Sequence, residues 1–113
     1  MSIRFRTAVA AAGVVLGVAA SAASAQTVTG NAEAGKNKNS MCTGCHGIPG
    51  YRTAYPEVYH VPKIGGQQPA YIIAALKEYK SGARWHPSMR GIAASLSEQD
   101  MADLAAYYGG SGK

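Results

Sequence analysis

Cys42-Thr43-Gly44-Cys45-His46 is the stretch of this 113-residue chain that decides its fold. Two thiols three positions apart, with a histidine directly after them, form the attachment signature for c-type haem. Each sulfur can add to one haem vinyl group, and the short peptide between the cysteines holds both against the same porphyrin edge. His46 can then reach the iron, because an imidazole is a normal proximal haem ligand. The pattern predicts one covalently bound haem c.

Three other uses of a Cys-x-x-Cys pair remain open at this point. A redox dithiol expects a strand-helix setting among alternating strands and helices, and the sequence has no such pattern. A zinc site needs further ligands, and since Cys42 and Cys45 are the only cysteines, these would come from His46, His60 and His86. A disulfide between the two cysteines would close a very small loop and stabilise little.

The first 25 residues have the pattern of an export signal. Two arginines give a positive start, residues 8–20 are an apolar run, and Ala23-Ser24-Ala25 is a small-residue cleavage sequence. The alternative is a retained anchor, but the run is shorter than the roughly 20 apolar residues that span a bilayer. We therefore expect a cleaved signal peptide of residues 1–25, a periplasmic domain of residues 26–113, and no membrane span after cleavage.

Size and charge limit the classes of function. Cleavage would leave 88 of the 113 residues, one small domain whose own apolar core would be marginal, and a buried haem would complete that core. The full chain has 11 basic and 6 acidic side chains. Leaving out Arg4 and Arg6 gives 9 against 6, so the domain is only mildly basic. Without a dense basic stripe and interleaved aromatics, the sequence does not support nucleic-acid binding.

Beyond the signal the sequence predicts an all-α domain with helices over residues 31–41, 68–80 and 97–108. Polar N-caps and glycine stops mark their ends: Asn31 and Ser97 as caps, Gly82 and Gly109-Gly110 as stops. Apolar side chains recur at i, i+3, i+4 and i+7 on the last two helices, which predicts one buried face on each. These are Ile72, Ala75, Leu76 and Tyr79, and then Met101, Leu104, Ala105 and Tyr108.

Taken in order, these features resemble a class I monohaem cytochrome c. They are a first helix, the Cys42-x-x-Cys45-His46 motif, a loop with Pro62-Lys63-Ile64-Gly65-Gly66-Gln67, a helix with Tyr71, then Met89, and a terminal Leu104-Ala105-Ala106-Tyr107-Tyr108. The likeness covers residues 30–108 and is greatest to small soluble bacterial members and to single halves of their dihaem relatives. It implies an all-α cytochrome c fold whose N- and C-terminal helices cross around one haem, with His46 below the iron and a methionine above it.

Met89 is the methionine expected above the iron. The other three are excluded by position, since Met1 leaves with the signal, Met41 touches the attachment motif, and Met101 lies on the apolar face of the last helix. A flexible core filler is the other role for Met89, which we expect in a loop between helices. His86 and His60 are rival ligands, and bis-histidine ligation would lower the reduction potential. We expect His86 at the surface or the haem rim.

The resemblance also implies roles around the haem. Pro62 corresponds to a proline whose carbonyl accepts a hydrogen bond from the proximal histidine, although an ordinary turn residue is the alternative. Tyr71 is expected to contact the haem. Gly35 corresponds to the glycine where the first and last helices cross, opposite Tyr107. Residues 48–60 are longer and richer in tyrosine than in the shortest members, and they would cover a haem edge or a partner surface, or serve only as loop filler.

The predicted function is that of a periplasmic electron carrier, not an enzyme, which passes single electrons between redox proteins through one haem c. One alternative is a dedicated electron-transfer subunit of a larger dehydrogenase or oxidase complex. Another is a haem peroxidase or gas sensor, which would need an open distal site. Seven basic side chains form a loose positive rim for acidic docking surfaces, or are merely solvated: Lys36, Lys38, Lys63, Lys77, Lys80, Arg84 and Arg90.

Overall fold

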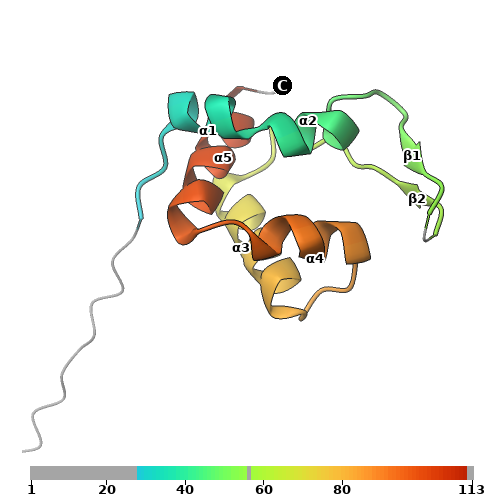
Figure 1. Ribbon diagram of the computed structural model, residues 1–113. Coiled ribbons are helices and arrows are strands. Elements are labelled where there is room, and N and C mark those ends of the chain that lie inside the picture. Colours follow the sequence, from blue (N-terminus) through green and yellow to red (C-terminus); the bar gives the residue numbers. More distant parts are fainter. Residues whose placement is uncertain (1–27, 56, 112–113) are drawn as a thin grey trace, which may run out of the picture.

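A computed structural model of the chain describes residues 28–55 and 57–111 (Figure 1). The predicted signal peptide and the expected cleavage point before Gln26 lie outside the described residues. Within the described ranges, no helix combines the length and the apolar character needed to cross a membrane.

The described part of the chain folds into short helices and one hairpin (Figure 1). In chain order these are α1 (Ala32–Lys38), α2 (Ser40–His46), β1 (Arg52–Thr53), β2 (Tyr59–His60), α3 (Pro69–Ser81), α4 (Pro87–Ala94) and α5 (Glu98–Ser111). The two strands pair antiparallel, with Arg52 opposite His60 and Thr53 opposite Tyr59. The prediction of an all-α domain is confirmed, since the strands contribute two residues each.

Helices α1 and α5 cross at Gly35, as the sequence predicts. Gly35 is buried, and a Cβ atom at this position would overlap the Asp103 carbonyl oxygen and lie 2.8 Å from the Tyr107 Cβ. Gly30, just before α1, is equally close to the Ala102 carbonyl oxygen. The two backbones can approach this closely because glycine has no side chain, and the crossing joins the two ends of the domain.

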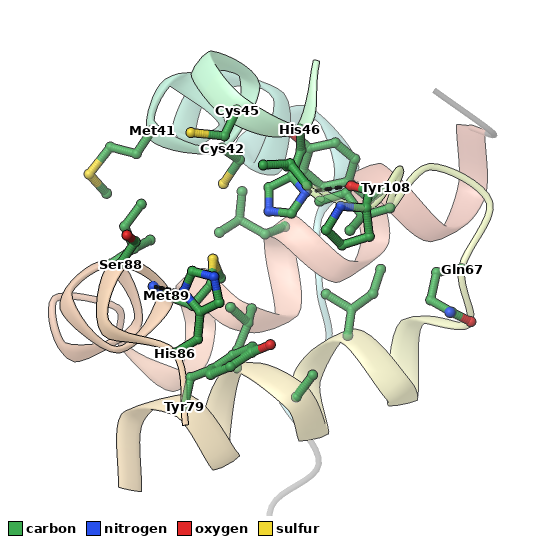
Figure 2. Close-up of a pocket in the computed structure, with 18 of the residues that line it drawn as sticks. Met41, Cys42, Cys45, His46, Gln67, Tyr79, His86, Ser88, Met89 and Tyr108 are labelled. Atoms are coloured by element: carbon green, nitrogen blue, oxygen red, sulfur yellow. Dashed lines mark hydrogen bonds between the residues drawn. The ribbon is translucent and has the colours of Figure 1, made fainter. Parts of the chain in front are cut away.

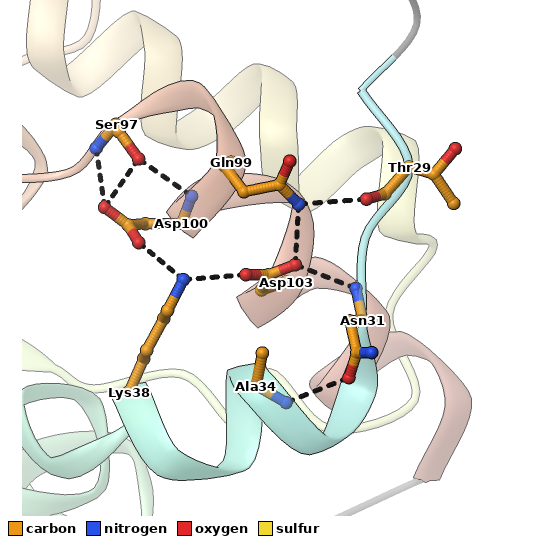
Figure 3. A network of polar contacts seen from close by, with 8 residues as sticks. All are labelled: Thr29, Asn31, Ala34, Lys38, Ser97, Gln99, Asp100 and Asp103. Carbon is orange, nitrogen blue, oxygen red and sulfur yellow. Dashed lines mark hydrogen bonds and ion pairs between the residues drawn. The ribbon is translucent and has the colours of Figure 1, made fainter.

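A polar cluster secures the same crossing, and we call it the Lys38 clamp (Figure 3). Lys38 Nζ donates to Asp103 Oδ2 and lies 2.7 Å from one carboxylate oxygen of each of Asp100 and Asp103. Asp103 is 2% exposed and also accepts from the Asn31 N–H and the Gln99 amide, both at 2.8 Å. The hydrogen bonds from Lys38 hold the pKa of both carboxyls below their usual range, and those carboxyls raise the pKa of Lys38.

The predicted helix caps are confirmed. The Asn31 side chain accepts from the Ala34 N–H at 3.0 Å at the start of α1. Ser97 Oγ accepts from the Asp100 N–H at 3.1 Å, and Asp100 Oδ2 accepts in return from the Ser97 N–H at 2.9 Å, which is a capping box at the start of α5. Gly82 ends α3 with a φ of 87°, in the left-handed region that glycine favours.

Helices α3, α4 and α5 enclose the apolar core. Met101 is 1% exposed at its centre, in agreement with its predicted place on the apolar face of the last helix. The other buried members of this core are Ile72, Leu76, Ala93, Leu96, Leu104, Ala105 and Tyr108. Ala75 and Tyr79, predicted on the buried face of α3, are only half-buried because this end of the face is turned toward a cavity.

Two predicted helix boundaries are wrong. The single helix expected over residues 31–41 is divided at Asn39, whose carbonyl accepts from the Cys42 and Thr43 N–H groups and from the Thr43 hydroxyl, so that α2 starts a new turn there. Helix α5 also continues through Gly109-Gly110 to Ser111. Gly109 packs against the start of α3, where a Cβ atom would lie 2.8 Å from Pro69 Cδ, so this glycine serves packing and does not end the helix.

Two elements were not predicted at all. Helix α4 covers Pro87–Ala94, where the sequence analysis expected a loop around Met89. Strands β1 and β2 form a hairpin within residues 48–60, which were expected to be a loop. Both elements border the cavity described next, so both corrections bear on the functional site.

Candidate functional site

A cavity of about 450 Å³ separates α2 from the packed helices α3, α4 and α5 (Figure 2). The volume falls within the range of about 300–1,000 Å³ that is usual for cofactor pockets. Most of its lining side chains are apolar. The lining comes from α2, the strands β1 and β2, the loop after β2, α3, α4 and α5. In Figure 2 the side chains of Cys42 and His46 reach into the cavity from α2, and that of Met89 reaches in from α4 on the opposite wall.

Helix α2 presents the attachment motif to the cavity. Cys42 and Cys45 are three residues apart, so they share one face of the helix, and both are half-buried free thiols that line the cavity. Burial raises the pKa of the Cys42 thiol, and a hydrogen bond with Tyr108 offsets part of that effect. The two sulfurs are therefore presented side by side on one wall, as two thioether bonds to one haem edge require.

The His46 imidazole is held by the loop that follows β2. Its Nδ1 lies 2.6 Å from the Pro62 carbonyl oxygen, which is the contact that the resemblance implied for Pro62. Because a carbonyl can only accept, Nδ1 must carry the proton of the neutral ring and the Nε2 lone pair is free. This tautomer is the one that a metal-ligating histidine needs, and the carbonyl also fixes the ring orientation.

Met89 lies in the first turn of α4, half-buried against the apolar core, and not in a loop as predicted. Its backbone N–H donates to His86 Nδ1 at 3.3 Å, which makes His86 the N-cap of α4. A neutral imidazole that accepts at Nδ1 carries its proton at Nε2. His86 is half-buried and lines the cavity, so it is nearer to the predicted rim position than to the free surface.

The remaining rival ligand, His60, and the two other described methionines lie less favourably. His60 is exposed on β2 and reaches the cavity at its edge. Met41 is 48% exposed and lines the cavity from α2, on the same wall as the attachment motif. Met101 does not line the cavity. Met89 is therefore the methionine whose side chain enters the cavity from the wall opposite His46.

Tyr71, predicted to contact the haem, lines the cavity beside a cation. The Arg84 guanidinium donates to the Tyr71 hydroxyl at 3.4 Å and lies 5.7 Å from the centroid of its ring and 5.3 Å from that of Tyr79. These tyrosine hydroxyls raise the pKa of Arg84 further above its ordinary value. Arg84 Nε also pairs with Glu78 at 3.0 Å. Sequence analysis placed Arg84 only in a general positive rim and missed this position.

The side chains present fit a c-type haem better than the other groups considered. Among residues 28–55 and 57–111 no three His, Cys, Asp or Glu side chains come together as a metal site. The cysteines lie on a helix that follows another helix, and not on the strand-helix unit of a redox dithiol. Two thiols on one wall, an imidazole with a free Nε2, an opposing thioether and an apolar lining form a suitable donor set for haem.

The predicted positive rim is partly neutralised. Four of its seven side chains form ion pairs: Lys36 with Glu33, Lys38 with two aspartates, Lys77 with Glu98 and Arg84 with Glu78. Lys63 and Arg84 are the two members that line the cavity. The positive field near the cavity therefore rests on fewer groups than the sequence suggested.

Comparisons with known proteins identify the family of this chain. The family model described as cytochrome c matches residues 25–108. The chain is 38% identical over 79 residues to cytochrome c4 of Pseudomonas aeruginosa, covering 70% of this chain and 37% of that protein. It is also 38% identical over 82 residues to cytochrome c-554(548) of Halomonas halodenitrificans, covering 70% of this chain and 94% of that protein.

A solved structure shows the same fold. The crystal structure of reduced recombinant cytochrome c4 from Pseudomonas stutzeri superposes with a TM-score of 0.59 at 34% identity, covering 74% of this chain and 46% of that one. The chain thus spans less than half of the cytochrome c4 proteins that it matches, but nearly all of the smaller cytochrome c-554(548).

Proposed function

This chain belongs to the cytochrome c family, and from that membership we propose that it carries single electrons between redox proteins through one covalently attached haem c. The observation that carries the proposal is the opposition of two suitable ligands across one apolar cavity, His46 on α2 and Met89 on α4. A donor on each wall suits a closed electron-transfer site. It does not suit a peroxidase or a gas sensor, which needs one side of the iron open.

Each residue has a separate role in this proposal. Cys42 and Cys45 hold the cofactor by thioether bonds, so that it stays attached when its charge changes. His46 is the proximal ligand, and Pro62 fixes its ring through the Nδ1 contact. Met89 is the distal ligand, and its neutral sulfur favours the reduced state. The haem, when bound, supplies one-electron chemistry at its iron.

The tautomer of His86 supports methionine over histidine as the distal ligand. His86 accepts the Met89 N–H at Nδ1, so its proton is on Nε2 and neither nitrogen has a lone pair to offer to iron. To become a ligand, His86 would have to lose the contact that caps α4. His46 has the opposite tautomer and loses nothing by ligation through Nε2.

The sequence supports a proposal of one haem and of an exported location. Cys42 and Cys45 are the only cysteines of the 113 residues, so this chain can attach one haem by two thioethers. We propose residues 1–25 as a cleaved signal, residues 26–113 as the cytochrome domain and the periplasm as its location. Its partners are an electron donor and an electron acceptor, recognised in part through the cations Lys63 and Arg84 at the cavity.

A second candidate is a dedicated electron-transfer subunit of a larger dehydrogenase or oxidase. Three strongly exposed apolar side chains favour it: Tyr55 (87%), Val58 (69%) and Trp85 (69%). The first two belong to the hairpin whose Tyr59 packs on His86, the residue that follows Trp85. Exposed apolar side chains that gather on one surface are typical of protein contacts. Stable copurification with a larger polypeptide from native extracts would favour this candidate, and a free monomer would favour the shuttle.

The ligand assignment is tested with Met89→Ala. Loss of the thioether should abolish the far-red sulfur-to-iron charge-transfer band of the oxidised protein, lower the reduction potential and let the reduced protein bind carbon monoxide. Met41→Leu is the matched control, since Met41 is the other methionine at the cavity, and it should leave all three properties unchanged. Persistence of the band in Met89→Ala, or its absence from the wild-type protein, would overturn His/Met ligation.

A further inference from the structure

The hairpin of residues 51–61 is built to hold one aromatic ring in place. Besides the pairing of Thr53 with Tyr59, the Tyr59 N–H donates to Thr53 Oγ1 at 3.1 Å. At the other end of the side chain, the Tyr59 hydroxyl donates to Glu57 Oε2 at 2.9 Å. The Val61 N–H donates to the Tyr51 carbonyl at 3.0 Å and extends the pairing beyond β2. The Tyr59 side chain is half-buried although its neighbours His60 and Val58 are exposed.

That ring packs on His86. The centroids of Tyr59 and His86 are 4.4 Å apart with the rings tilted by 43°. Tyr79 of α3 contacts the same imidazole edge-on, with centroids 6.3 Å apart. Both geometries are favourable for aromatic pairs. The His86 imidazole is therefore in contact with two rings from other elements, one from the hairpin and one from α3.

The same imidazole supports the first turn of α4. Its Nδ1 accepts the Met89 N–H, one of the donors that a helix start leaves without an intrahelical partner. Histidine is not among the usual N-cap residues, so this cap depends on holding the ring at the right place. Helix α4 has eight residues and contains the exposed Gly91, which lowers its intrinsic stability. Met89 is then oriented by a short helix whose start depends on His86.

From this chain of contacts we propose that the hairpin sets the position of the distal ligand, with Tyr59 and His86 as positioning residues for Met89. Tyr59 holds the His86 ring, His86 holds the Met89 backbone, and the Met89 sulfur is thereby kept at the cavity. This inference deepens the proposed function and rests on it. It assigns to residues 48–60 a role that the sequence left open between covering an edge, docking a partner and filling a loop.

The test uses the haem-loaded protein and one pair of variants in the hairpin. Tyr59→Ala removes the ring that packs on His86. Tyr55→Ala is the matched control, because it makes the same change in the same hairpin at a side chain that is 87% exposed. Displacement of the methionine from oxidised iron is measured by titration with free imidazole, and the loss of the far-red band is the signal that monitors it. Losing an aromatic pair should raise the imidazole affinity of Tyr59→Ala about twofold to tenfold, and Tyr55→Ala should bind as the wild-type protein does.

Variants at His86 separate the cap from the ring packing. His86→Asn keeps a side-chain acceptor for the Met89 N–H, whereas His86→Ala removes it, so imidazole affinity should rise more in His86→Ala than in His86→Asn. Tyr59→Phe keeps the ring and loses only the bond to Glu57, so its imidazole affinity should lie between that of the wild type and that of Tyr59→Ala. Equal affinities in wild type, Tyr59→Ala and His86→Ala would overturn the proposal.

A second measurement does not depend on the identity of the ligand. Amide hydrogen exchange of the Met89 N–H reports directly on the cap, and it should be faster in Tyr59→Ala by a similar factor while amides within α3 keep their rates. Unchanged exchange at Met89 would overturn the positioning role. If the far-red band is absent from the wild-type protein, His/Met ligation fails, and faster exchange at Met89 alone would still establish the contact between hairpin and cap.

Discussion

Replacing Gly35 by alanine tests the helix crossing that holds the two ends of the domain together. Alanine is favoured over glycine in a helix by about 1 kcal/mol, so in an open helix the change would stabilise the protein. At Gly35 the added Cβ overlaps the Asp103 carbonyl oxygen and lies 2.8 Å from the Tyr107 Cβ. Overpacking costs about 1–3 kcal/mol, and the upper end applies here because a backbone atom cannot move aside as a side chain does.

The expected net loss is therefore about 2 kcal/mol, the overpacking cost reduced by the gain in helix propensity. For a domain of this size that corresponds to a fall in the melting temperature of about 8–16 °C. Far-ultraviolet circular dichroism of the haem-loaded protein during heating measures it. Gly91→Ala is the matched control, since a Cβ at that exposed helical position meets nothing within 4 Å, and this variant should melt higher than wild type. If both variants melt higher, the close approach of α1 and α5 is refuted.

Two further predictions concern the clamp and the core. Lys38→Met should destabilise the protein at pH 7, and the difference from wild type should shrink below about pH 4. Ionised Asp100 and Asp103 stabilise the fold at a pH above their unfolded pKa of about 3.9, because their pKa is lowered in the folded protein. This stabilisation is lost as the pH falls and the two carboxylates take up protons. Denaturant unfolding at pH 7 and pH 3 measures this, and a difference independent of pH would contradict it. Met101→Ala should lower the free energy of unfolding by about 2–5 kcal/mol, because the side chain is 1% exposed. It should leave the far-red band in place, and loss of that band would assign Met101 a role at the haem.

Features fixed by a few neighbouring residues were predictable from the sequence. The caps Asn31 and Ser97 and the glycine end of α3 are local, and each was found where the pattern indicated. The Pro62 contact was also expected, but only from the resemblance to a family, because no local pattern relates this carbonyl to His46 across sixteen positions.

Features that depend on distant contacts were not predictable in the same way. Gly109 has the appearance of a helix stop, and only the packing of Pro69 against it explains why α5 continues. Helix α4 was missed because its N-cap is a histidine, which is not among the usual N-cap residues. One signal was available: Pro87 at the first helical position, followed by Met89, Ile92, Ala93 and Leu96 at helical spacing.

The crossing of α1 and α5 also makes the cavity depend on contacts between distant parts of the chain. Asn31 and Asp103, which meet there, are 72 positions apart, and α5 supplies Leu104 and Tyr108 to the cavity. A contact of such long range costs the entropy of closing a long loop. A change that loosens the crossing, although it lies outside the cavity lining, would therefore also loosen the wall that α5 provides.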